Sequence, residues 1–257
     1  MKFVIDAHLH LYPCYDLNLA VRTLARNLEA GAPGAVACAF LTERQDCDYF
    51  TRFSAEGLTD SGHGIAVLPA NSGRILTVTE KGERRAYIFP GRQYATRERI
   101  EILALGVRPE IQETASARET VEKILEADGI PVLSWAPGKW MFGRSAVVKE
   151  LVERFCPGDL LIGDSALRPR GVPEPRLIKE ARAEGTPVVA GSDPLPISGE
   201  EKRMGGYVTV AEGGHDPEKP ADSVRDLLRQ RPLNLSAAGR RCSALGTALR
   251  LLRLRLS

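Results

Sequence analysis

The chain has 257 residues, of which 43% are hydrophobic and 26% charged, and its formal net charge is +2. This length suits one large domain with a sizeable core, and the near-neutral charge gives no reason to expect a nucleic-acid partner. The five cysteines are scattered without a CxxC pair, which favours reduced thiols. No segment approaches the roughly 18 apolar residues of a membrane span. The first residues lack the features of a signal peptide, so we expect a cytoplasmic protein.

Short, β-rich apolar runs alternate with amphipathic helical stretches over most of the chain. In chain order, strands are expected at residues 3–8, 35–41, 65–68, 75–79, 86–89, 100–105, 131–135, 160–162 and 187–190. Helices are expected at residues 17–30, 115–127, 146–155 and 174–183. The segment Glu80-Lys81-Gly82-Glu83 predicts a hairpin turn between the fourth and fifth of these strands.

Strands that alternate with helices favour an α/β fold with a parallel sheet and right-handed crossovers. About seven such strands suggest a closed or nearly closed barrel, and an open doubly wound sheet is the alternative. After residue 205 the composition changes, and a strand-like segment at 207–210 precedes a polar loop and two helical stretches. We therefore expect a single domain over residues 1–257, with a barrel core at about 1–211 and a helical extension at about 221–257.

The segment Asp6-Ala7-His8-Leu9-His10 ends the first expected strand. Side chains at positions i and i+2 of a strand share one face, so His8 and His10 present two imidazoles together, with Asp6 on the same side. In a parallel barrel these strand ends open onto the functional site. Two neutral imidazoles suit Zn, Mn or Fe, although carboxylates from elsewhere must complete the ligand set. The alternative is that both histidines are ordinary polar residues at a strand exit.

Residues 5–10 resemble the opening of the PHP (polymerase and histidinol phosphatase) family, whose members are distorted seven-stranded barrels related to the metal-dependent hydrolases. Further segments that resemble the family follow in its order over residues 3–195: Phe40-Leu41-Thr42-Glu43-Arg44, Pro90-Gly91-Arg92-Gln93, Ile100-Glu101-Ile102-Leu103-Ala104-Leu105-Gly106, Pro131-Val132-Leu133-Ser134-Trp135-Ala136-Pro137-Gly138 and Ala190-Gly191-Ser192-Asp193-Pro194-Leu195. The resemblance implies a distorted (β/α)7 TIM-like barrel.

The chain also departs from this family where metal ligands are expected. The positions concerned carry Arg44, Gln93, Glu101, Ala136 and Leu195. An arginine stays charged and only donates hydrogen bonds, so it cannot coordinate a metal, and alanine and leucine offer no ligand atom. The family's three-metal site therefore cannot form in its usual way. Of the metal ligands that the resemblance implies, His8, His10 and Asp193 are still present in this sequence.

Two interpretations of this reduced site stay open. In the first, one divalent Zn, Mn or Fe ion is held by the three remaining ligands and by a glutamate, Glu43 or Glu101, which completes the shell or acts as base. In the second, no ion is bound, and Arg44 is a fixed counter-ion in an inactive barrel that binds an anionic ligand or serves as a scaffold. A third hypothesis is an amidohydrolase-type enzyme, although no clear carbamate-type lysine is present.

The leading hypothesis is a phosphoesterase-like, metal-dependent hydrolase that acts on a small anionic molecule, and whether the chain is an enzyme at all is left open. The phosphate preference comes from the resemblance and from nearby basic residues. The predicted catalytic residues are Glu43, Glu101 and Arg44. The predicted substrate-binding residues are Arg92, Lys139, Trp140 and Arg144, with Trp140 either an aromatic wall over the ligand or part of a loop packed on the barrel rim.

Three further features of the sequence are separate from the predicted site residues. Asp164 follows the strand expected at residues 160–162 and is expected to cap the following turn, with a position at the mouth of the barrel as the alternative. His63 and His215 lie in glycine-rich or polar loops, and both are expected to face solvent.

The segment 237–256 has leucines at helical spacing among arginines. We expect a basic terminal helix that packs on the barrel or on a second subunit, and contact with an anionic membrane or an acidic partner is the alternative.

Overall fold

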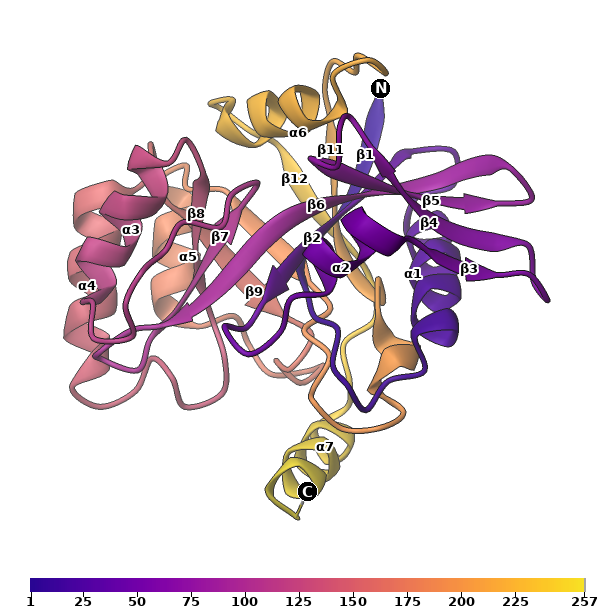
Figure 1. Cartoon of the computed structure of the whole chain (residues 1–257). Helices are drawn as coiled ribbons and strands as arrows, with labels where there is room; N and C mark the ends of the chain where they lie inside the picture. The colour runs from indigo at the N-terminus through magenta and orange to yellow at the C-terminus, as the bar shows by residue number, and fades with distance from the viewer. Residues whose placement is uncertain (257) are drawn as a thin grey trace.

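In a computed structural model that describes residues 1–256, the strands form one curved, mixed sheet. Seven of its strands form a barrel in the order β10-β9-β8-β7-β6-β2-β1, and β11 and β12 continue the sheet beyond β1 (Figure 1). The seven strands are β1 (Lys2–Leu9), β2 (Val36–Glu43), β6 (Glu83–Ala95), β7 (Glu101–Leu105), β8 (Ile130–Ser134), β9 (Leu161–Ser165) and β10 (Val188–Gly191). The expected α/β barrel is confirmed, and the open doubly wound alternative is wrong.

The barrel comes close to closure where β10 meets β1. The backbone N–H of Asp193, two residues after β10, donates to the carbonyl of His8 at 2.9 Å. Gly191 permits this approach, because a Cβ at that position would lie 2.3 Å from the Cβ of His8 and 2.7 Å from its backbone nitrogen. The absence of a side chain at Gly191 therefore decides how near the two ends of the barrel lie.

One barrel strand runs against the others, which corrects the expectation of a wholly parallel sheet. β7 pairs antiparallel with both β6 and β8, whereas β1, β2 and β6 are mutually parallel, as are β8, β9 and β10. Only residues 96–100 separate β6 from β7, which is too short for a crossover helix and allows only a hairpin. The start of β7 therefore lies at the same end of the barrel as the ends of its neighbours, and Glu101 pairs with Ser134, the last residue of β8.

An antiparallel extension of the sheet continues from β6 (Figure 1). It contains β3 (Leu58–Asp60), β4 (Ile65–Ala70) and β5 (Ile75–Glu80). The expected hairpin turn is confirmed between β5 and β6, where Lys81 and Gly82 have φ values of 52° and 83°. Two consecutive positive φ values are typical of a type I′ turn, whose twist matches that of a hairpin.

Four helices occupy the stretches where the hydrophobic periodicity predicts them: α1 (Leu17–Gly31), α3 (Ala117–Glu126), α4 (Arg144–Phe155) and α5 (Arg176–Ala183). α1 begins where the Asp16 side chain accepts a hydrogen bond from the N–H of Leu19 at 3.0 Å. α3 begins with a capping box formed by Ser116 and Glu119. A further short helix, α2 (Tyr49–Glu56), follows β2.

The C-terminal region is less helical than expected. It contains β11 (Tyr207–Glu212), α6 (Pro220–Arg229), β12 (Leu235–Gly239) and α7 (Ala244–Leu256), and β12 pairs with β11. Residues 235–239 therefore form a strand within the extension. The division of the chain into a core and an extension stays a prediction.

The last helix, α7, projects from the body of the molecule (Figure 1) and packs on it through an unexpected face. Its four regularly spaced leucines are exposed rather than packed on the barrel: Leu245, Leu249, Leu252 and Leu256. Leu251 and Leu254 make the contact instead, against Leu195 and Ile197. Contact of the exposed face with a second subunit or another surface stays a prediction. No helix among residues 1–256 is long and apolar enough to cross a membrane.

Gly191→Ala should destabilise the protein by about 1–3 kcal/mol, because the new methyl group forces β10 away from the backbone of β1. Urea unfolding monitored by circular dichroism measures the change. Gly158→Ala is the matched control, since no atom lies within 4 Å of the added Cβ there, and it should change stability by less than about 0.5 kcal/mol. Equal changes in the free energy of unfolding for the two substitutions would show that the close approach of β10 to β1 does not require glycine at position 191.

Candidate metal centre

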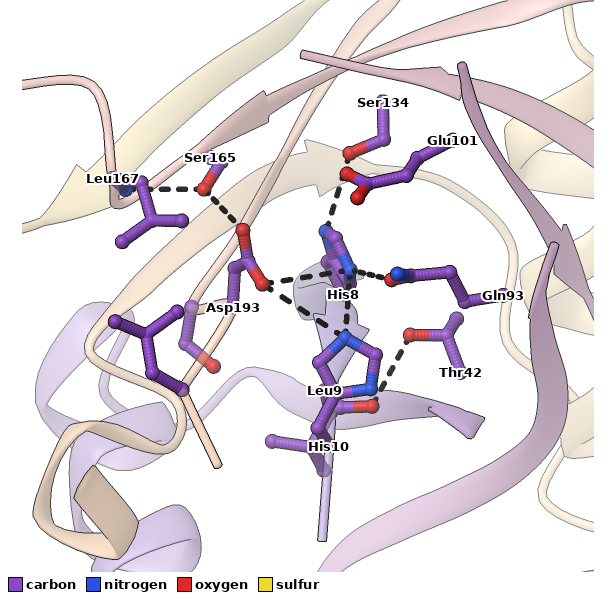
Figure 2. A network of polar contacts seen from close by, with 12 residues as sticks. His8, Leu9, His10, Thr42, Gln93, Glu101, Ser134, Ser165, Leu167 and Asp193 are labelled. Carbon is purple, nitrogen blue, oxygen red and sulfur yellow. Dashed lines mark hydrogen bonds and ion pairs between the residues drawn. The ribbon is translucent and has the colours of Figure 1, made fainter. Parts of the chain in front are cut away.

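Four side chains bring nitrogen and oxygen atoms together at the end of the barrel (Figure 2). The Nε2 atom of His8 lies 2.9 Å from His10 Nε2 and 2.8 Å from Gln93 Oε1. Asp193 Oδ1 lies 3.7 Å from His8 Nε2 and 3.8 Å from His10 Nε2. The ligand atoms of His8, His10 and Asp193 all lie within 4.8 Å of one another, and the three residues are buried. The predicted trio is therefore assembled from β1, the residue after β1 and the loop after β10.

The orientation of Asp193 is fixed from several sides. Its φ of 44° is in the left-handed region, which a residue other than glycine adopts stably only where its surroundings impose it. The hydroxyl of Ser165, the last residue of β9, donates to Asp193 Oδ2 at 2.6 Å, while the Asp193 N–H is held by the His8 carbonyl. These contacts leave Asp193 Oδ1 directed at the two imidazoles (Figure 2).

Asp6 does not join the cluster, in contrast to the expectation from strand alternation. The pairing of β1 with β2 shifts register between Asp6 and Leu9, so the regular alternation of side chains is interrupted there. The buried Asp6 carboxylate instead accepts hydrogen bonds from the backbone N–H groups of His8, Ser192 and Gly205, and from the Ser192 hydroxyl. Asp6 thus ties β1 to the loop that carries Asp193.

The charges of the cluster suit a cation. Burial, followed by the neighbouring His8, lowers the pKa of His10 to about 3, so this imidazole is neutral at physiological pH. Burial opposes ionisation of Asp193, but the nearby histidines, the Ser165 hydroxyl and Arg250 together lower its pKa below the ordinary value. An ionised carboxylate therefore faces a neutral imidazole.

The donor set fits a single divalent ion. For metal–ligand bonds of about 2.0–2.1 Å, tetrahedral geometry places neighbouring donor atoms about 3.3 Å apart. The three separations among His8, His10 and Asp193 and the one between His8 and Gln93 run from 2.8 to 3.8 Å. The second ring nitrogen has a hydrogen-bond partner in His8 but not in His10. His8 Nδ1 lies 3.4 Å from the Ser134 hydroxyl, whereas His10 Nδ1 is buried and has no hydrogen-bond partner among residues 1–256. Imidazole nitrogens with carboxylate and amide oxygens suit Zn, Mn or Fe.

The two glutamates predicted from sequence lie in different places. Glu101 pairs with Ser134 across the sheet, and its carboxylate points toward His8 (Figure 2). Its Oε1 atom is 3.0 Å from Lys139 Nζ. Glu43 is buried and accepts the N–H groups of Tyr49 and Phe50 at the start of α2, so its side chain caps that helix. Burial raises the pKa of Glu43 to about 7. Glu101 is thus brought to the cluster, whereas Glu43 is engaged with α2.

The predicted anion-binding residues are only partly brought to the cluster. Arg44 is half-exposed, pairs with Asp46 at 3.3 Å, and its charge contributes to the lowered pKa of His10. Arg92 donates to the carbonyls of Arg44 and Cys47. Arg144 donates to the carbonyl of Gly138. Of the predicted anion-binding residues and Arg44, Arg44 and Lys139 therefore present positive charge near the cluster, whereas Arg92 and Arg144 are engaged with backbone carbonyls.

Trp140 does not form an aromatic wall at the mouth of the barrel. It is 7% exposed and packs in the core cluster that includes Leu133 and Val148. Its indole N–H donates to the carbonyl of Ser134 at 3.0 Å. Trp140 thus supports the end of β8, as the alternative of a loop packed on the rim predicts.

Other polar residues differ from their expected roles. Asp164 does not cap a turn: it accepts two hydrogen bonds from Arg168, at 2.7 and 2.5 Å, and one from the Tyr207 hydroxyl at 2.7 Å. His63 is exposed as expected and pairs with Asp60. His215 is partly buried and packs edge-on against Phe3, with ring centroids 5.7 Å apart.

Sequence reasoning missed the part played by three polar residues around the cluster. Gln93 keeps an oxygen near His8 although it lacks the expected carboxylate. Ser134 and Ser165 are the last residues of β8 and β9. A polar residue at the final position of a barrel strand is the signal that could have identified both serines.

No protein-family model matches the sequence, and no curated protein is significantly similar to it. The structure resembles that of PsfC from Pseudomonas syringae PB-5123, with a TM-score of 0.57, 16% identity, and coverage of 99% of this chain and 97% of that one. It also resembles the lesion-specific endonuclease Q of Pyrococcus furiosus, with a TM-score of 0.54, 13% identity, and coverage of 89% and 56%.

A third similar structure is a complex of endonuclease Q with a 27-mer duplex substrate that has an abasic lesion at the active site. Its TM-score is 0.50, its identity 12%, and the match covers 88% of this chain and 56% of that one. This chain thus matches just over half of the length of each endonuclease Q chain. At these identities the comparisons show a shared fold.

Glu43→Gln should leave metal affinity within about twofold of the parent, because Glu43 faces α2, and should change the pH dependence of stability. The folded-state pKa of Glu43 is raised from 4.5 to about 7, so its ionisation opposes folding. The stability of the parent relative to the variant should therefore fall as pH rises from about 4.5 to about 7, by about 1–3 kcal/mol.

Urea unfolding of both proteins across this pH range measures the difference. Glu113→Gln, at an exposed position, is the control and should show no such trend. Loss of metal binding in Glu43→Gln would instead assign Glu43 to the metal centre.

Proposed function

We propose that this chain is a metal-dependent hydrolase of phosphate esters, with one divalent ion held by His8, His10 and Asp193. The observation that carries the proposal is the convergence of these three side chains, together with the oxygen of Gln93, in a buried position at the end of the barrel. A neutral imidazole and an ionised carboxylate are the protonation states that a metal requires of its ligands.

The residues around the cluster supply the other groups that hydrolysis needs. A divalent ion bound there lowers the pKa of water toward neutrality and polarises a phosphoryl oxygen. The Glu101 carboxylate, which points toward His8 (Figure 2), would accept the proton of the attacking water and pass it to the leaving alkoxide oxygen as the phosphate-ester bond breaks. Lys139, held 3.0 Å from Glu101, offers a cation to an anionic oxygen of the substrate. Arg44 adds a second positive charge near His10.

Our proposed substrate is a small phosphate ester. The cationic groups near the cluster support an anionic substrate, and the net charge of only +2 does not suggest a long polyanion. The shared fold with an endonuclease that acts on lesion-containing DNA makes DNA the second substrate to assay. Cleavage of DNA without hydrolysis of small esters would replace the substrate in this proposal and keep the metal centre.

Tag-free protein, purified without chelators and then incubated with Mn, Zn or Fe, should retain close to one equivalent of metal by mass spectrometry. The double variant His8→Ala, His10→Ala should retain less than a tenth of an equivalent, because the two imidazoles provide both nitrogen ligands of the proposed site. His63→Ala, at an exposed position, is the control and should bind metal like the parent.

The same preparations test the reaction with p-nitrophenyl phosphate and its bis-ester. The metal-loaded parent should hydrolyse at least one of them, and the double variant should not. A parent that takes up less than a tenth of an equivalent of any of the three metals would contradict the proposal and favour the inactive scaffold.

A further inference from the structure

The loop after β10 carries Asp193, and the C-terminal helix α7 lies against this loop. Leu251 and Leu254 of α7 share a small apolar cluster with Leu195 and Ile197 of the loop. The cluster joins residues more than fifty positions apart in the sequence. The loop that carries the third metal ligand is therefore packed partly on the last helix of the chain.

A buried ion pair strengthens this contact. Arg250 of α7 is 3% exposed and Glu200, just after the loop, is 2% exposed. Arg250 Nε lies 3.0 Å from both carboxylate oxygens of Glu200, and Nη2 lies 2.5 Å from Glu200 Oε2. Arg250 Nη2 also lies 3.4 Å from the carbonyl oxygen of Asp193. One guanidinium thus contacts both ends of the segment from 193 to 200.

The other contacts of this segment show why it needs external support. Asp193 has a left-handed backbone, which costs free energy unless the surroundings impose it. Glu200 Oε2 accepts the N–H of Leu195 at 3.3 Å, and the Tyr15 hydroxyl donates to the Leu195 carbonyl at 2.6 Å. Without Arg250, the buried Glu200 carboxylate would keep its contact with the half-exposed Arg203, whose Nε lies 3.0 Å from Glu200 Oε1, but would lose its buried partner.

We propose that Arg250 is a positioning residue of the metal centre: through Glu200 and the carbonyl of Asp193, it holds the loop so that the Asp193 carboxylate points at His8 and His10. This inference rests on the proposed function. Arg250 forms its hydrogen bond with the backbone carbonyl of Asp193 and not with the carboxylate oxygens that face the histidines. Arg250 therefore acts through the conformation of the loop. α7 is then part of the site.

Arg250→Met tests the proposal with two readouts. Metal affinity, measured by competition with a chromophoric chelator, should fall about 10- to 100-fold, as for loss of an outer-shell partner. In the metal-free protein, hydrogen exchange of the amides of Asp193, Leu195 and Ile197 should become at least about tenfold faster, while the amides of β8 keep the parent rate.

Arg250→Lys keeps the charge but loses the forked guanidinium, so it should show the same changes to a smaller extent, and it replaces Arg250→Met if that variant does not fold. Arg255→Met, at an exposed position of the same helix, is the matched control and should alter neither readout. A folded Arg250 variant with parental metal affinity and parental loop exchange would overturn the proposal, even if its melting temperature is lower. If the parent binds no metal, the proposed function fails, and the exchange rates still decide the role of Arg250.

Discussion

The contact between β1 and the loop after β10 is the constraint on which the rest of the site depends. At its centre the buried Asp6 carboxylate accepts N–H groups from His8, Ser192 and Gly205. Burial raises the pKa of Asp6 to about 6, while the hydrogen bonds that it accepts favour the ionised form. His8 lies in β1 and Asp193 lies in the loop after β10. The contact that brings the barrel near closure therefore also brings these metal ligands together.

Segments from the two ends of the chain meet at the contact between β1 and the loop after β10. The imidazoles come from the first strand and the residue after it, the carboxylate from the loop after the last barrel strand, and the support for that loop from the C-terminal helix. Ala136 and Leu195, at positions where the family resemblance in the sequence predicts further ligands, offer no ligand atoms. The chemistry is therefore concentrated on one cluster, toward which Glu101 points, and Lys139 Nζ lies 3.0 Å from Glu101 Oε1.

Local sequence signals predicted much of this arrangement. The alternation of apolar runs and amphipathic stretches predicted the barrel strands and four helices. The HxH segment predicted the two imidazoles of the cluster, whereas Asp193 was predicted only by the family resemblance. The direction of β7 was missed although the short connection before it allows only a hairpin. Glu43 was misplaced, and the choice between the two roles of Trp140 was left open, because the sequence does not show which neighbours a buried side chain contacts. Arg250 could not be found, since its partners lie about fifty residues away and nothing in a basic helix indicates a buried ion pair.

The convergence of four donor groups on one cation position is tested most directly by adding a negative charge to one of them. Gln93 Oε1 lies 2.8 Å from His8 Nε2, so Gln93→Glu places a carboxylate of nearly the same shape beside the proposed ion. Zn and Mn dissociation constants of the parent and of this variant should be compared at one pH and one salt concentration. We predict binding at least about tenfold tighter in Gln93→Glu, because a charged ligand replaces a neutral one. Unchanged or weaker binding in a folded variant would show that no cation occupies this position.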